Sequence, residues 1–257
     1  MFEILFLLFG LIIGSFLNVV SMRYKGDSPQ KGEFSLFMRQ GRSHCPHCGK
    51  VLAWHELIPI ASFIIQKGRC RSCGHKLSLQ YPVVELATGI IFALLAGKIG
   101  FMDSTAVTSL SIWLLASVFF ILIAAIDFRL FIIPDALNIG IAFLGVGITI
   151  LQRDYFNHAL AAVIGAIFFG AIVLATRGQG MGGGDIKLAG AMGLLLGLPD
   201  VIFAFMSAFI IGALWGVGLM ILRKKTLKDA VPFGPFLVIG TFLSLFLTPF
   251  FLNMLLL

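Results

Sequence analysis

The chain has 257 residues, of which 59% are hydrophobic and only 12% are charged, and its formal net charge is +7. A soluble domain carries roughly twice that charged fraction, so the composition excludes an ordinary soluble globular protein. Uncharged apolar segments of about 20 residues recur, each long enough to cross a bilayer as a helix. We therefore predict an all-α polytopic membrane protein with about eight transmembrane helices, at 2–20, 83–102, 107–126, 132–151, 158–176, 186–198, 201–222 and 232–256.

The first apolar segment, MFEILFLLFGLIIGSFLNVV, is predicted to stay in the protein as a transmembrane helix. It begins with Glu3 rather than with a basic cluster, and it shows no A-x-A-like cleavage site. Such a site and a basic start are what a cleaved signal peptide would require.

Basic residues predict the orientation in the membrane. If the polar segment 21–82 faces the cytoplasm, alternation of the spans places 17 of the 19 Lys and Arg residues on that side, and only Lys98 and Arg153 lie near the other face. Membrane topology thus accounts for the positive net charge. The chain shows no DNA-reading motif, so we expect the lipid bilayer as its surroundings and no nucleic-acid partner.

The polar segment contains two C-x2-C pairs, Cys45/Cys48 and Cys70/Cys73, separated by 21 residues. This spacing is slightly longer than the usual four-cysteine zinc pattern but of the same kind. Gly49 and Gly74 follow the pairs directly and suit tight turns. Disulfides are the alternative, but the predicted cytoplasmic location is reducing. We predict a structural Zn²⁺ bound by the four thiolates, with the neighbouring His44, His47 and His75 as substitutes or simply as neighbours.

Three aspartates lie at the predicted cytoplasmic ends of apolar segments. Asp127 ends the third predicted span, Asp135 begins the fourth and Asp185 begins the sixth. Acidic residues at membrane depth are costly and often mark function. Asp135 follows Pro134 at the start of a span, where it is suited to cap the helix. We therefore expect Asp127 rather than Asp135 to work with Asp185.

A glycine-rich stretch, Gly182, Gly183 and Gly184, precedes Asp185. The absence of side chains would let an extended peptide backbone approach this carboxylate. Phosphate binding is the alternative, but neither G-x-x-x-x-G-K-[ST] nor a dinucleotide-binding βαβ unit is present. Two nearby aspartates that share one proton suit peptide hydrolysis, because one can activate water while the other polarises the carbonyl.

Five segments together resemble the type IV prepilin leader peptidases, which are intramembrane aspartyl proteases with a G-x-G-D motif. The resemblance runs almost end to end, through GSFLNVVSMR (14–23), the cysteine segment (43–85), AIDFRLFIIPD (125–135), GMGGGDIKLAGAMG (180–193) and VPFGPFLVIG (231–240). It implies that 1–20 is a first helix, 21–82 a zinc-binding cytoplasmic domain and 83–257 the peptidase.

The resemblance also implies a function. It makes Asp127 and Asp185 the catalytic pair, Gly182–Gly184 the motif glycines, and the four cysteines the zinc ligands. The family cuts the leader of type IV prepilins and pseudopilins after a glycine, at the cytoplasmic face of the bacterial inner membrane. It then methylates the new N-terminal residue, usually phenylalanine, with S-adenosylmethionine. Methyl transfer here rests on this resemblance and on the presence of the cysteine segment.

Other interpretations of the sequence remain open. The chain could be a peptidase without methyltransferase activity, or an ion-coupled transporter with a zinc-stabilised domain. A transporter would place acidic groups near mid-bilayer and often shows paired halves, whereas these acids crowd one face. A presenilin-type protease would not explain the cysteines. Glu85, just inside the second span, is a weaker candidate for contact with the basic residues of a leader.

Overall fold

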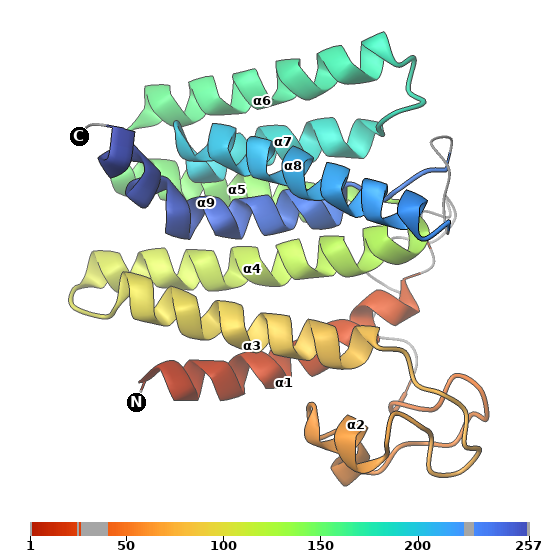
Figure 1. The fold of residues 1–257 in the computed structure, drawn as a ribbon. Coiled ribbons are helices and arrows are strands. Elements are labelled where there is room, and N and C mark those ends of the chain that lie inside the picture. The colour runs from red at the N-terminus through yellow and green to blue at the C-terminus, as the bar shows by residue number, and fades with distance from the viewer. Residues whose placement is uncertain (1, 25, 27–40, 224–228, 256–257) are drawn as a thin grey trace. The chain divides into compact units, whose positions relative to one another are not determined.

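The computed structural model describes residues 2–24, 26, 41–223 and 229–255 (Figure 1). Lys224, Lys225 and Lys228, which contribute to the predicted cytoplasmic charge, lie outside the described residues, as does part of the predicted zinc-binding segment, 27–40. The chain divides into two compact units, Met1–Ala125 and Ile126–Leu257.

Helices account for most of both units. The first unit holds α1 (Phe2–Arg23), η1 (Trp54–Glu56), α2 (Ala61–Ile65), α3 (Gln80–Ile99) and most of α4 (Ser104–Leu130). The second unit holds the end of α4, α5 (Asp135–Gln152), α6 (Tyr155–Ala175), α7 (Gly183–Leu196), α8 (Asp200–Ile221) and α9 (Gly234–Leu255).

The all-helical prediction is confirmed, whereas the number of spans is only partly settled. Among the residues that the structure describes, six helices are long and apolar enough to cross a membrane: α1, α3, α4, α5, α6 and α8. The two others at predicted positions are α7, which has only 14 residues, and α9, in which the described apolar stretch is Gly234–Thr248. A 14-residue helix is about 21 Å long, short of the ~30 Å hydrocarbon layer.

In the first unit, α1 and α3 pack side by side (Figure 1). Small residues permit this approach, because a Cβ on Gly10 would lie 2.7 Å from the Thr88 carbonyl oxygen and one on Gly14 would lie 2.7 Å from the Glu85 Cα. Gly10 and Gly14 are four residues apart and share a helix face, as in the G-x-x-x-G packing of membrane helices. Their contact holds the start of α3 against α1.

In the second unit, α7 is the central short helix and packs against α5 and α6. Gly165 and Gly193 allow the contact with α6, because a Cβ at either position would collide with the backbone of the facing helix. Eight of the 14 residues of α7 are buried, Asp185 among them. The packing fixes the direction of α7 and therefore the position of its first turn.

The other packed pair of the second unit is α8 with α9. Aromatic rings fix the entry to α9: Phe233 packs on Phe209 with ring centroids 5.0 Å apart, and on Phe169 of α6 at 6.1 Å. Aromatic pairs at such separations add to the free energy of burial. Phe233 directly precedes Gly234, so the cluster positions the first residue of α9.

Candidate active site and metal centre

Asp127 lies one turn before the end of α4 and is only 5% exposed. Its Oδ2 accepts a hydrogen bond from the backbone N–H of Gly234, at 2.9 Å. The first N–H groups of a helix have no partner within the helix, and the helix dipole is positive there. The start of α9 therefore provides the buried Asp127 carboxylate with a backbone donor in place of water.

Gly234 is a site residue that the sequence patterns did not single out. A Cβ at this position would lie 2.8 Å from Asp127 Oδ2, so a side chain would push the carboxylate away. Phe233 anchors the entry of α9, and Pro235 follows Gly234 in the first turn, where the missing N–H costs no helical hydrogen bond. The signal in the sequence was a glycine between Phe and Pro at the start of an apolar segment.

Asp185 lies in the first turn of α7 and is 8% exposed. Its Oδ2 accepts a hydrogen bond from the N–H of Gly182, at 3.1 Å, and this contact caps the helix. The other oxygen, Oδ1, is buried and has no hydrogen-bond partner among the residues that the structure describes. Buried polar atoms nearly always have a hydrogen-bond partner. The capping contact therefore explains the position of Oδ2 but not the burial of Oδ1.

The second unit brings Asp127 and Asp185 together. The two are 58 positions apart in sequence, yet both carboxylates are buried within this unit. Two carboxylates that interact in a low-dielectric site share a proton more cheaply than both ionise. A pair in that state combines a proton acceptor with a proton donor, which is the requirement for acid–base attack of water on a carbonyl group.

The backbone conformation does not require glycine at the three positions before Asp185. None of Gly182, Gly183 and Gly184 has a positive φ, and Gly182 has φ −87°. A Cβ on Gly183 would meet no atom within 4 Å, whereas one on Gly184 would lie 3.1 Å from the Ile133 Cβ. A Cβ on Gly182 would lie 3.7 Å from Asp185 Oδ2. Glycine at 183 therefore faces open space, and glycine at 184 permits close packing.

Asp135, the alternative partner of Asp185, is engaged elsewhere. It lies in the first turn of α5 with an exposed side chain, and both of its oxygens accept hydrogen bonds from Lys187 Nζ, at 2.8 and 2.7 Å. No capping hydrogen bond of this carboxylate is among the described contacts, in which it binds Lys187. The ion pair connects the first turn of α5 with α7.

The four cysteines of the first unit form one cluster. Their Sγ atoms all lie within 4.8 Å of one another, and Cys45 Sγ is 4.0 Å from Cys73 Sγ. Zinc–sulfur bonds of ~2.3 Å in a tetrahedron place the sulfur atoms roughly 3.8 Å apart. All four are free cysteines in this structure. The donor set and its spacing fit a structural Zn²⁺ site.

Each cysteine pair lies on the same kind of turn. Gly49 N–H donates to the Cys45 carbonyl and Gly74 N–H to the Cys70 carbonyl, both at 2.9 Å. Both glycines have left-handed backbones, with φ +71° and +68°, as their positions in the sequence predicted. The turns present two sulfur atoms each toward the same point.

The histidines lie around this cluster. The rings of His47 and His75 stack with centroids 4.2 Å apart, and each histidine lies two residues after a cysteine. His44 lies within 3.3 Å of the Arg42 carbonyl oxygen through Nδ1. Since the four sulfur atoms complete a tetrahedron, the histidines are neighbours of the metal position in this arrangement.

Comparison with known proteins is consistent with both parts of the chain. Residues 8–99 match the family described as "Bacterial Peptidase A24 N-terminal domain", and residues 114–217 match the "Type IV leader peptidase family". No solved structure matches.

Three relatives that are similar over most of their length are each named "Prepilin leader peptidase/N-methyltransferase". The Bacillus subtilis (strain 168) protein is 35% identical over 250 residues, which cover 95% of this chain and 93% of the relative. The Burkholderia pseudomallei (strain 1026b) protein is 33% identical, over 95% and 85% of the two chains. The Aeromonas salmonicida (strain A449) protein is 32% identical, over 95% and 90%.

Proposed function

This chain belongs to the type IV leader peptidase family, and from that premise we propose that it is a bifunctional, multi-pass membrane enzyme whose peptidase centre is Asp127 with Asp185. The peptidase removes the leader of prepilins or pseudopilins after a glycine, and the methyltransferase then modifies the new N-terminal residue. The family match does not favour the transporter alternative. Both activities act at the cytoplasmic face of the bacterial inner membrane, where the basic residues are concentrated.

The two aspartates have different roles in hydrolysis, one as general base and the other as general acid. Asp127, which receives the Gly234 N–H at the positive end of α9, is the ionised carboxylate that takes a proton from water. Asp185 holds the shared proton and donates it as a hydrogen bond to the carbonyl oxygen of the scissile bond. Water adds to the carbonyl carbon, the C–N bond breaks, and the leaving amine takes up the proton that Asp127 removed from water.

One observation carries this proposal: Asp185 Oδ1 is buried and has no hydrogen-bond partner among the described residues, in the same unit that buries Asp127. A purely structural helix cap would not need that second oxygen. The space beside Gly183 supports access for a substrate backbone to the pair. Neither observation involves the cysteine cluster, which belongs to the first unit.

The cysteine cluster supports the fold of the polar segment. Cys45, Cys48, Cys70 and Cys73 would hold Zn²⁺ in a closed site of four thiolates, where no position remains for water. Such a metal stabilises a small segment that has too little apolar core of its own. S-adenosylmethionine supplies the methyl group for the second activity.

The test of the peptidase centre is cleavage of a full prepilin by the membrane-inserted enzyme with Asp127→Asn or Asp185→Asn. Each variant should lower the cleavage rate by ~10³-fold or more, since acid–base groups contribute ~10²–10⁴. Asp135→Asn is the matched control, because it removes an aspartate from the exposed pair with Lys187, and it should cut at a rate close to the wild type. Full cleavage by either Asp127→Asn or Asp185→Asn would remove that residue from the proposed pair.

A further inference from the structure

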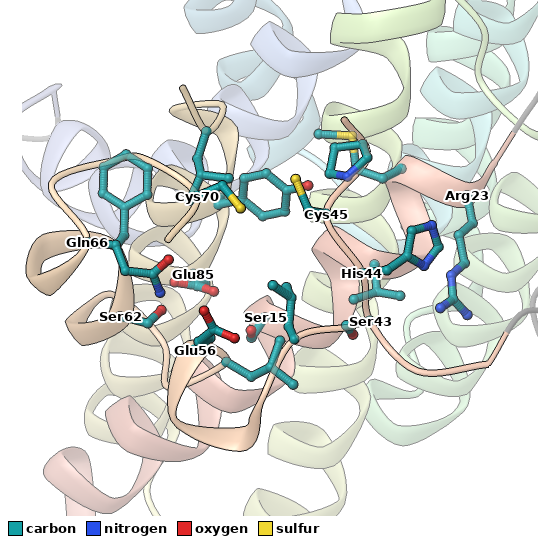
Figure 2. A pocket seen from close by; sticks show the side chains of 18 residues that line it. Ser15, Arg23, Ser43, His44, Cys45, Glu56, Ser62, Gln66, Cys70 and Glu85 are labelled. Atoms are coloured by element: carbon teal, nitrogen blue, oxygen red, sulfur yellow. The ribbon is translucent and has the colours of Figure 1, made fainter. Parts of the chain in front are cut away.

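The first unit contains a cavity that the peptidase centre does not use. Its volume is about 390 Å³, within the ~300–1,000 Å³ typical of pockets for small organic ligands. Residues of α1, of the cysteine segment and of the start of α3 line it. Cys45 and Cys70 contribute to its wall, so the metal cluster supports the cavity (Figure 2).

Two carboxylates reach this space from different elements (Figure 2). Glu56, at the end of η1, is 8% exposed and accepts a hydrogen bond from the Ala53 N–H at 2.9 Å. Glu85, in α3, is 6% exposed and accepts one from the Ile60 N–H at 2.7 Å. The Ala53 N–H lowers the pKa of Glu56, which is therefore ionised at neutral pH.

The donor to Glu85 is held in a strained turn. Ile60 has φ +59° and ψ −51°, and the next N–H, of Ala61, bonds back to the Pro59 carbonyl, which defines a γ-turn with positive φ. A β-branched residue rarely adopts this conformation, which costs of order 1–3 kcal/mol. Strain of this kind is retained where the surrounding structure fixes it, often at ligand sites. Here it directs a backbone N–H to Glu85.

The rest of the lining has a different character. Arg23 and His44 lie on one side of the cavity (Figure 2). Phe63 and Tyr81 contribute aromatic rings, and Leu52 contributes an apolar wall. The cavity thus combines two carboxylates, one guanidinium group and an apolar, aromatic surface. This set is complementary to a ligand with more than one positive charge, one carboxylate and a flat apolar ring.

We propose that this cavity is the binding site for the methyl donor, S-adenosylmethionine, with Glu56 and Glu85 recognising its positively charged groups and Arg23 its carboxylate. The inference rests on the proposed function, which requires such a donor, and it assigns the site to the first unit. In the transfer, the pilin amine forms a bond to the methyl carbon, the carbon–sulfur bond breaks with its electron pair on sulfur, and the nitrogen loses a proton to water.

Organic cations also occur in the substrate, in the basic residues of a leader. The experiment therefore measures binding of three probes to the purified full-length, zinc-loaded enzyme by calorimetry: S-adenosylmethionine, its neutral thioether product S-adenosylhomocysteine, and a basic leader peptide. The variants are Glu56→Gln and Glu85→Gln, which keep the hydrogen-bond acceptor oxygen. Glu3→Gln, at the exposed start of α1, is the matched control.

The wild type should bind the sulfonium donor more tightly than the neutral thioether. Glu56→Gln and Glu85→Gln should each raise the Kd for the donor by about tenfold or more, while Glu3→Gln should leave it unchanged. Unchanged donor binding in both cavity variants would overturn the proposal. Loss of leader binding in place of donor binding would also overturn it and would assign Glu85 to the leader.

A second measurement separates this inference from the proposed function. Mass spectrometry of a prepilin after reaction gives the cleaved fraction and the methylated share of the cleaved product. The inference predicts that the methylated share falls in the cavity variants. If the wild type cleaves nothing, the proposed function fails. If it cleaves and methylates while the variants retain the full methylated share, only the cavity assignment fails. Zinc content and melting temperature show that each variant is folded.

Discussion

Neighbouring glycines can be required for unrelated reasons, as Gly183 and Gly184 show. A methyl group on Gly183 has open space, whereas one on Gly184 would press on Ile133. Both residues have ordinary backbone angles, so neither needs to be glycine for its conformation. The repeated glycine in the sequence could not distinguish these cases, because the distinction depends on Ile133, which precedes α5.

This difference leads to a prediction for Gly183→Ala. The variant should fold with a melting temperature close to that of the wild type, since nothing lies within 4 Å of the added group. Its kcat/KM for prepilin cleavage should fall, by ~10-fold or more, because the methyl group occupies the space proposed for the substrate backbone. Steady-state cleavage with thermal unfolding is the measurement. Gly216→Ala, in equally open space on α8, is the control and should alter neither quantity.

At the scale of elements, the sequence was most informative where the chemistry is local. The C-x2-C spacing and the following glycines predicted two equivalent turns, and the structure has them with φ +71° at Gly49 and +68° at Gly74. The contact between Gly234 and Asp127 could not be predicted from the sequence, because it joins residues 107 positions apart through the packing of α9. Likewise, the contact of Asp135 with Lys187 depends on how α5 and α7 pack.

Removal of the metal should affect the two activities, methylation and cleavage, differently. Chelation of Zn²⁺ should unfold residues 43–76, since a metal bound by the four thiolates would join the two cysteine turns of this segment. Limited proteolysis should then cut within it. Methylation should be lost, because Cys45 and Cys70 form part of the cavity wall, while prepilin cleavage should be partly retained. Complete loss of both activities at equal chelator concentration would show that the peptidase centre also depends on the metal.

At the scale of the whole molecule, the positions of the basic residues predict which loops face the cytoplasm. Met102, between α3 and α4, is 97% exposed, and Gln179, between α6 and α7, is also exposed. In intact cells, a membrane-impermeant maleimide should label Met102→Cys from outside. It should not label Gln179→Cys until the cells are opened. Labelling of Gln179→Cys in intact cells would invert the proposed topology and place the aspartates on the wrong side of the membrane.

The hydrogen bond from α9 to Asp127 also bears on biosynthesis. α9 follows α1 to α8 in the chain, so a ribosome-bound chain that has inserted only those helices still lacks the backbone donor of Gly234 for this carboxylate. If Asp127 belongs to the peptidase centre as proposed, a nascent chain that lacks α9 should not yet cleave.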